Sequence, residues 1–197
     1  EIDDHLIELI AQHEKVCPHL HIPLQSGDTE ILSKMRRNYG AEQYKHITQH
    51  AASRIKPLGL GADVIVGFPG ESEKSFELTR KLIEELPFSY LHVFSYSPRS
   101  GTEAYNFKNN IKNTTKKERN LILSNLVKEK AHLFYKSFIG KKITVLIEEP
   151  KLDGILKGYS EHYTPVRIET KSSLKNQLVP VVIKDVQKNE LIGCLES

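Results

Sequence analysis

Hydrophobic positions in the first two thirds of the chain alternate between the spacing of helices and the spacing of strands. Apolar residues recur every three to four positions in stretches that predict helices near 4–13, 29–35, 41–55, 72–86 and 115–138. Shorter apolar or alternating runs predict strands at 19–24, 63–66 and 90–96. Because repeated strand–helix units build a parallel sheet, the fold class predicted for this part is α/β.

The run from Asp63 to Glu71 is the most informative local motif. Its apolar residues fit a strand that is buried on both faces, with Asp63 at its start in a structural role, and a glycine–proline turn carrying an acid follows directly. Gly67 and Gly70 lack a β-carbon, and Ser72 can cap the next helix, so backbone amides here can approach a ligand closely. Polar turns also follow the other two strands. Since parallel strands end at one edge of a sheet, the three turns together predict a binding site there.

Residues 140–197 have a different texture. Short alternating runs at 143–147, 166–169 and 179–186 are separated by glycine, proline and asparagine. About five such strands predict a small antiparallel β-barrel of the OB type, an architecture that often binds nucleic acid. The predicted domains are therefore 1–139 and 140–197. We expect the long helix before the barrel to begin with a capping box formed by Thr115 and Glu118.

Composition excludes several classes of protein. The longest apolar runs are only a few residues, and no basic stretch precedes an apolar segment, so neither a membrane span nor a signal peptide is predicted and a cytoplasmic location follows. Cys17 and Cys194 lie at opposite ends of the 197 residues, which argues against a disulfide framework. The chain opens with Glu1 in what reads as a helix, so we expect a piece of a longer protein.

Positive charge is concentrated in one stretch, although the net charge of +3 is too slight to indicate a partner. Between Lys108 and Lys142, ten lysines and arginines stand against two glutamates. Such a surface suits phosphate contacts, while the alternative is a solvated helix face. Because a β-barrel adjoins this stretch, we favour nucleic acid. The predicted RNA-binding residues are Lys116, Lys117, Arg119, Lys141 and Lys142.

Four ordered segments resemble one known family. They are 19–27 (HLHIPLQSG), 35–39 (MRRNY), 63–71 (DVIVGFPGE) and 91–102 (LHVFSYSPRSGT). In this order they resemble the radical-SAM tRNA methylthiotransferases. The last segment, with Pro87 and Phe88 before it, looks most like the branch that acts on threonylcarbamoyladenosine, rather than the isopentenyladenosine branch or the ribosomal-protein branch. Residues 140–197 resemble the RNA-binding TRAM domain of the family.

The resemblance implies a fold and an activity. The fold is the C-terminal half of a partial (β/α) radical-SAM barrel followed by a TRAM domain. The full-length enzyme would use S-adenosylmethionine and two [4Fe-4S] clusters to methylthiolate carbon 2 of a modified adenosine beside the anticodon. The implied partner is the anticodon stem-loop of tRNA, and the sulfur donor stays open. The protein itself would orient the cofactor and exclude water from the radical.

The chain departs from the family pattern at its cysteines. The triplet Cys-x-x-x-Cys-x-x-Cys is absent, and Cys17 and Cys194 are too far apart in the sequence to replace it. We therefore expect no catalytic residue in this chain, no cofactor bound to it alone, and no activity without the rest of the enzyme. Three strands taken from a barrel also expose edges that can pair with another chain.

The four matching segments imply which residues of this chain would form half of the cofactor pocket. Gln25 and Ser26 would hydrogen-bond the ribose or the methionyl group, and Arg37 would pair with the methionyl carboxylate. The turn after the second strand would shape the cofactor wall, and residues 95–97 would line the adenine. Loop stabilisation, a solvated helix end and an ordinary strand end are the respective alternatives. The full set of implied cofactor-binding residues is Gln25, Ser26, Arg37, Gly67, Pro69, Gly70, Ser95, Tyr96 and Ser97.

Two other functions stay open. Three histidines and Cys17 within nine positions resemble the start of a metal-dependent barrel hydrolase, in which a metal would activate water. The next two strands end without histidine, so no metal site is predicted. The other alternative is a non-catalytic RNA-binding protein in which the sheet only carries the β-module. Cluster cysteines in the sequence upstream would favour the enzyme.

Overall fold

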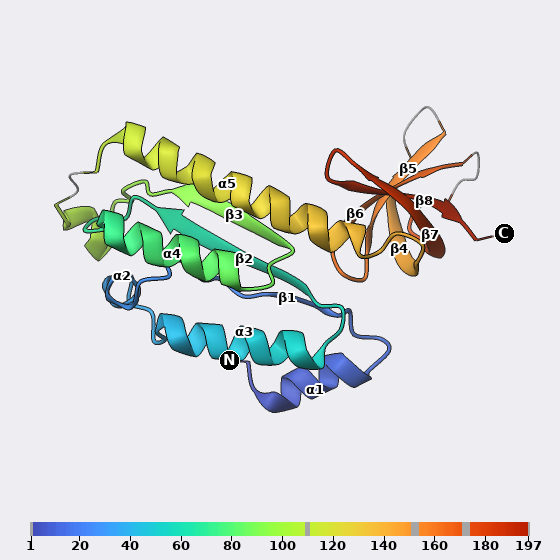
Figure 1. Cartoon of the computed structure of the whole chain (residues 1–197), viewed down its shortest axis with the longest axis horizontal. Helices are drawn as coiled ribbons and strands as arrows, with labels where there is room; N and C mark the ends of the chain where they lie inside the picture. The colour runs from blue at the N-terminus through green and yellow to red at the C-terminus, as the bar shows by residue number, and fades with distance from the viewer. Residues whose placement is uncertain (1, 109–110, 151–153, 171–173, 197) are drawn as a thin grey trace.

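The protein has two parts, a three-stranded sheet backed by helices and a closed β-barrel, and one long helix runs from the first to the second (Figure 1). The computed structural model describes residues 2–108, 111–150, 154–170 and 174–196. The first part contains α1 (Asp4–Gln12), β1 (His19–His21), α2 (Thr29–Lys34), α3 (Ala41–Arg54), β2 (Gly59–Val66), α4 (Glu73–Glu85), β3 (Tyr90–Ser95), the 3-10 helix η1 (Glu103–Asn106) and α5 (Asn113–Lys136). The barrel contains β4 (Lys142–Pro150), β5 (Ile155–Ser160), β6 (Pro165–Glu169), β7 (Leu178–Gln187) and β8 (Glu190–Leu195).

The sheet is parallel throughout, with the strand order β1-β2-β3, which confirms the α/β prediction. Two boundaries differ from the sequence prediction. β1 ends at His21, and beyond it the chain is joined to β2 by separate hydrogen bonds, such as those from the Ile22 N–H to the Gly61 carbonyl and from the Leu24 N–H to the Asp63 carbonyl. β2 begins at Gly59, so Asp63 lies in mid-strand and not at its start. Glycine and alanine at 59–62 hid the first half of β2 from a search for β-branched residues.

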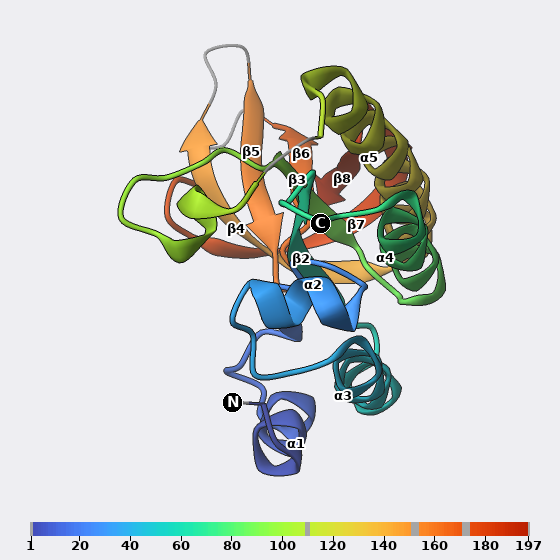
Figure 2. The same ribbon diagram turned by 90° about the vertical axis from the view of Figure 1, so that its left-hand side faces the viewer.

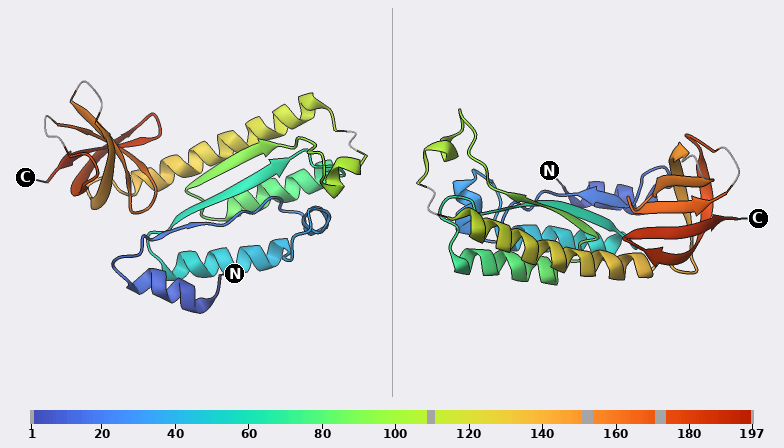
Figure 3. Two further views of the ribbon diagram at one scale, coloured as in Figure 1. Left: turned by 180° about the vertical axis from the view of Figure 1, so that it is seen from behind. Right: turned by 90° about the horizontal axis from the view of Figure 1, so that it is seen from above.

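The two faces of the sheet differ in chemistry. One face presents Leu60, Ala62, Val64 and Val66, none of which is exposed, and these residues pack against α3, α4 and α5. The right-hand view of Figure 3 shows the three helices along one side of the sheet. Side chains alternate across a strand, so the opposite face carries the aromatic rings of β1 and β3. Phe94 on that face is 52% exposed.

The barrel closes in the order β4-β5-β6-β8-β7. Four of its strand pairs are antiparallel and the β6–β8 pair is parallel. The prediction of a purely antiparallel barrel is therefore wrong in this pair. The reason is geometric, because five strands in a closed ring cannot all alternate in direction.

The helix starts follow the sequence in one case and not in another. Ser72 caps α4 and forms a capping box with Ser75, which confirms the predicted start of that helix. α5 begins at Asn113 with Lys112 at the N-cap and no side-chain cap, so the capping box predicted for Thr115 and Glu118 is wrong. The helix starts earlier than the capping signal indicated, which places Thr115 inside the first turn.

One helix contributes to both cores. Leu123 and Val127 of α5 pack in the core under the sheet, while Ala131, Tyr135 and Phe138 pack in the barrel core. The domain boundary after residue 139 stays a prediction. No helix among the described residues is long and apolar enough to cross a membrane.

Candidate functional site

The turns that follow β1, β2 and β3 converge at the carboxyl edge of the sheet. Figure 2 views the protein from this end, where α2, the start of α4 and the segment around η1 surround the tips of the strands. Parallel strands with helices on one face collect their βα turns at this edge, which is why ligands bind there in α/β proteins. The edge is therefore the candidate site, as the sequence predicted.

A buried ion pair fixes the turn after β2. Both carboxylate oxygens of Glu71 accept the Gly67 N–H, each at 3.1 Å, and Arg119 Nη1 donates to Glu71 Oε1 at 2.5 Å. Arg119 Nη2 donates to Glu73 Oε2 at 2.9 Å. Burial raises the pKa of the Glu71 carboxyl, and the Gly67 N–H and the Arg119 guanidinium act in the opposite direction. The acid of the motif thus holds the turn in shape, while Arg119 comes from α5.

Lys116 links this turn to the end of β3. A β-carbon on Gly67 would lie 2.4 Å from Lys116 Cγ, and Gly67 has a φ of +76°, so only glycine fits here. Lys116 Nζ donates to the Tyr96 carbonyl at 3.1 Å and lies 5.5 Å from the centre of the Tyr96 ring. The side of Gly67 on which a β-carbon would stand is therefore covered by Lys116, and its role at a cofactor stays a prediction.

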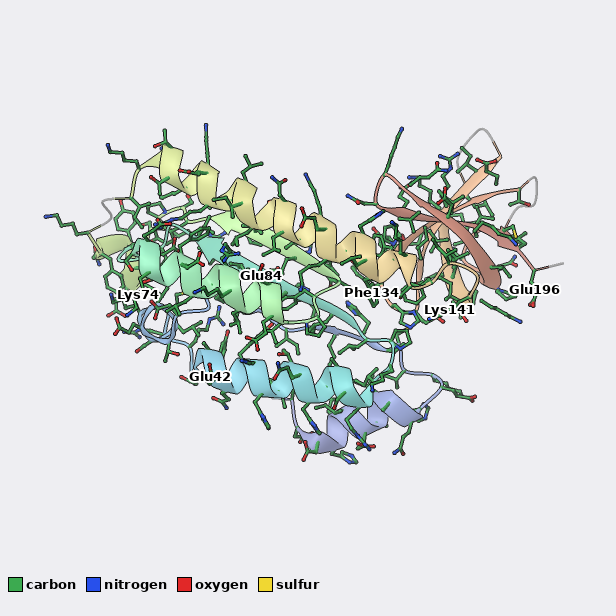
Figure 4. All side chains as sticks on the ribbon, viewed as in Figure 1. Glu42, Lys74, Glu84, Phe134, Lys141 and Glu196 are labelled. Atoms are coloured by element: carbon green, nitrogen blue, oxygen red, sulfur yellow. The ribbon has the colours of Figure 1, made fainter. Side chains whose placement is uncertain are left out.

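Burial contradicts the prediction that Lys116 and Arg119 contact RNA. Both side chains are buried and used within the sheet part, whereas Lys117, Lys141 and Lys142 are exposed. Figure 4 marks Lys141 where α5 meets the barrel. The helical period carried the missed signal, since positions 116 and 119 lie in phase with Leu123 and the rest of the buried stripe.

The turn after β1 is mostly inward-facing. Gln25 is buried with a left-handed backbone, φ 67°, a conformation that costs free energy in a residue with a side chain. Ser26 is also buried, and its Oγ lies 3.4 Å from Thr79 Oγ1, which accepts the Gly27 N–H at 2.9 Å. Ser26 therefore has the loop-stabilising role that was the alternative interpretation. Arg37 is exposed.

The turn after β3 supports a short 3-10 segment. The Tyr96 hydroxyl donates to the Ala104 carbonyl at 3.0 Å, and its ring packs edge-on against Phe68 at 5.2 Å between centroids. Ser95 and Ser97 are exposed. Tyr96 thus braces the segment around η1, while the two serines point to solvent.

A cavity of about 420 Å³ opens between these turns. Its lining residues are Lys34, Pro69, Gly70, Asn106, Phe107 and Lys108. Pro69 and Gly70 are the predicted site residues that line it. The other four were missed, because α2, η1 and the residues directly after η1 reach this place only through the tertiary fold.

The open face of the sheet carries a histidine–tyrosine network near the start of the strands. The Tyr90 hydroxyl lies 2.9 Å from His19 Nε2 and 3.0 Å from His21 Nδ1, and His21 Nε2 lies 3.3 Å from Asp63 Oδ2. Burial lowers the pKa of His19 and raises the pKa of Tyr90 to about 12. The network connects all three strands on this face.

The two cysteines of the chain do not fit an iron–sulfur cluster. Within the described part of the chain, no three His, Cys, Asp or Glu side chains gather as ligands of a metal would. Cys17 is exposed between α1 and β1, and Cys194 lies in β8. A [4Fe-4S] cluster needs several thiolates at one place, so its ligands would have to come from outside this chain.

Comparison with known proteins gives a family match. The profile of the radical SAM superfamily matches residues 1–83. A tRNA-2-methylthio-N(6)-dimethylallyladenosine synthase of Oceanobacillus iheyensis is 38% identical over 197 residues, which cover 99% of this chain and 38% of the relative.

Two further relatives carry a different substrate in their names. Threonylcarbamoyladenosine tRNA methylthiotransferase MtaB of Thermotoga maritima is 32% identical over 98% of this chain and 44% of its own length. A probable threonylcarbamoyladenosine tRNA methylthiotransferase of Methanocaldococcus jannaschii is 42% identical over 84% of this chain and 37% of its own length. The chain spans about two fifths of the length of these curated relatives.

Proposed function

The chain belongs by sequence to the radical-SAM tRNA methylthiotransferases, and from this premise we propose that it forms the C-terminal portion of such an enzyme. The observation that carries the proposal is continuity. The similarity to the relatives runs through the parallel sheet and on through the closed barrel, covering 99% of the chain in one case. A shared sheet alone would support a fold, whereas two different folds in the same order support a shared protein.

The proposed reaction is the methylthiolation of carbon 2 of a modified adenosine in tRNA. S-adenosylmethionine and two [4Fe-4S] clusters, bound in the longer protein, would supply the radical, sulfur and methyl chemistry. The residues of this chain would shape one wall of the site at the carboxyl edge, where Pro69 and Gly70 are among the residues that line the cavity. By itself the chain would be inactive, because it lacks the thiolates for a cluster.

We propose threonylcarbamoyladenosine as the modified nucleoside. The support is the segment 91–102 with Pro87 and Phe88 before it, which is most similar to that branch. The names of the relatives include both nucleosides, so the experiment must measure both.

The barrel would act as a TRAM domain that binds the anticodon stem-loop. Lys117, Lys141 and Lys142 are the exposed lysines proposed for phosphate contacts, although Lys142 also pairs with Glu196 at 2.5 Å. A tRNA substrate is also the reason for proposing a cytoplasmic location.

The proposal is tested on the longer protein that the gene encodes. After anaerobic reconstitution with iron and sulfide, it is incubated with S-adenosylmethionine, a reductant and tRNA carrying either modified adenosine, and the digested nucleosides are analysed by mass spectrometry. We expect the 2-methylthio derivative of the threonylcarbamoyl nucleoside. RNA binding with neither product would favour a non-catalytic RNA-binding protein, and the dimethylallyl product alone would overturn the assigned nucleoside.

A further inference from the structure

We propose that the cavity between Lys34 and Lys108 binds a backbone phosphate of the RNA substrate beside the site of reaction. The cavity lies at the carboxyl edge, where its wall is Pro69 and Gly70 of the turn after β2. The inference rests on the proposed function for the identity of the RNA. It adds a second RNA contact, distinct from the one proposed for Lys117, Lys141 and Lys142.

The first argument is the balance of charge at this edge. Glu71 and Glu73 are paired with Arg119, and Glu103 is paired with Arg36. These ion pairs neutralise three acids at this edge of the sheet. Within the described ranges, the side chains of Lys34 and Lys108 have no hydrogen bond or ion pair, and both residues are exposed. Two uncompensated ammonium groups at the rim of one cavity attract an anion.

The second argument is the shape of the turn beneath Lys34. A β-carbon on Gly70 would stand 3.0 Å from Lys34 Nζ, so the ammonium group lies directly over the backbone of the turn. Gly70 has a φ of +88°, which glycine adopts without strain. The turn leads into the N-terminus of α4, whose dipole also favours negative charge. A phosphate oxygen can therefore approach lysine and backbone together.

The third argument is the remainder of the lining. Phe107 and Asn106 complete the cavity, and the Phe107 ring packs edge-on with Phe68 at 6.3 Å between centroids. An aromatic ring supports a stacked base, and an amide can hydrogen-bond a base edge. The cavity thus offers two lysines for a phosphate and, beside them, an aromatic ring for a base. Together these groups can hold one unpaired nucleotide.

The experiment measures RNA binding by the chain as it stands. A fluorescein-labelled anticodon stem-loop is titrated at several salt concentrations with the wild type, with Lys34→Ala/Lys108→Ala, and with Lys15→Ala/Lys128→Ala as a control of equal charge that leaves the cavity intact. We expect the cavity variant to bind at least about 5-fold more weakly and its salt slope to fall by about 1, as for the loss of one phosphate contact. Equal slopes in the two variants would overturn the proposal.

A neutral linkage in the RNA locates the phosphate. Methylphosphonates are placed singly on either side of the target adenosine, and at one linkage we expect the wild type to lose affinity while the cavity variant does not change. Phe107→Leu should weaken binding of the intact stem-loop, but not of a probe with an abasic site at the stacked nucleotide. If no single linkage abolishes the difference between wild type and variant, the assignment to a phosphate is wrong.

The methionyl carboxylate of the cofactor is the other source of an anionic group. Equilibrium dialysis with labelled S-adenosylmethionine separates the two, using the reconstituted longer protein with and without Lys34→Ala/Lys108→Ala. Unchanged cofactor affinity with weakened RNA binding supports the proposal, and the opposite result overturns it. Failure of the proposed function would instead remove nucleoside modification and leave the salt-slope result intact, so the two failures are distinguishable.

Discussion

The sheet and the barrel deal with their strand edges in different ways. The barrel pairs β4 with β7 and leaves no free edge, so its core is closed by its own strands. The sheet ends at β1 and β3, and helices cover one of its faces only. The two parts also differ in where their buried and clustered polar side chains lie. The barrel has buried polar side chains at its β5–β6 turn, namely Ser160, His162 and Thr164, whereas the sheet holds a buried ion pair at its carboxyl edge and a histidine–tyrosine network on its open face.

The largest expected effect comes from breaking the buried ion pair of the sheet. Arg119→Met leaves the Glu71 carboxylate buried without a cation, and we expect a loss of about 3–5 kcal/mol in the free energy of unfolding. Hydrogen exchange followed by mass spectrometry should show faster exchange in α4 and β2, with the barrel strands still protected. Equal loss of protection in both parts would mean that they unfold as one unit.

The matched control restores the balance of charge. Glu71→Gln in the Arg119→Met background removes the uncompensated charge, so part of the lost stability should return. If the double variant is no more stable than Arg119→Met, then packing of the guanidinium, and not charge, accounts for the effect.

The next largest effect is a pH dependence of stability that comes from His162, near the junction between the sheet and the barrel. Burial lowers the pKa of His162 to about 4 from 6.5, and its ring packs 4.8 Å from Phe138. Below pH 6.5 the unfolded chain binds a proton at His162 more readily than the folded chain does. The free energy of unfolding is therefore highest above pH 6.5 and falls by at most about 3 kcal/mol as the pH drops towards 4. His162→Phe keeps a ring against Phe138 and should flatten the dependence of the melting temperature on pH over this range.

His46 is exposed on α3 and serves as the control for that pH dependence. His46→Gln should melt with the same pH dependence as the wild type. A wild-type curve that His162→Phe does not flatten would show that other groups carry the acid sensitivity.

A smaller effect is expected from crowding the same junction. A β-carbon on Gly59 would stand 2.2 Å from the His162 carbonyl oxygen, so Gly59→Ala should push the β5–β6 turn away from the sheet and cost about 1–3 kcal/mol. Gly40→Ala is the control, because its β-carbon meets only the side chain of Thr29, at 3.2 Å. Thermal melting compares the two, and equal losses would argue against a tight junction.

An effect of similar size is expected at the first turn of the candidate site. Thr79→Val removes the acceptor of the Gly27 N–H, a buried bond of 2.9 Å, and should cost about 1–3 kcal/mol. Exposed Thr114→Val should change little. Urea unfolding gives both values. A loss no larger than that of Thr114→Val would show that Ser26 and its neighbours keep their arrangement without Thr79.

Local signals in the sequence predicted most of the elements. Helical spacing located α3 and α5, and Ser72 marked the start of α4, because these depend on neighbours within a few positions. Periodicity and capping signals gave the wrong structure where the neighbouring residues carry no such signal. Glycine and alanine hid the first half of β2, and an odd number of strands forced a parallel pair into the barrel.

The candidate site was predictable as a place but not as a set of residues. The convergence of three turns follows from the order of parallel strands, which the sequence contains. Which side chains face that place depends on partners far along the chain. Ser26 is directed to Thr79 and Gly67 is covered by Lys116, while Lys34 and Lys108 arrive from two other elements.

The α/β order, the β-module after it, the edge that holds the candidate site and the family resemblance all follow from the sequence alone. These features depend on periodicity, turn residues and motifs, each of which involves residues that are close together in the sequence. Which charged side chains are free to contact a ligand depends on the tertiary structure. Burial and ion pairing are set by long-range contacts, so Lys116 and Arg119 are used inside the fold while Lys34 and Lys108 remain at the rim of the cavity.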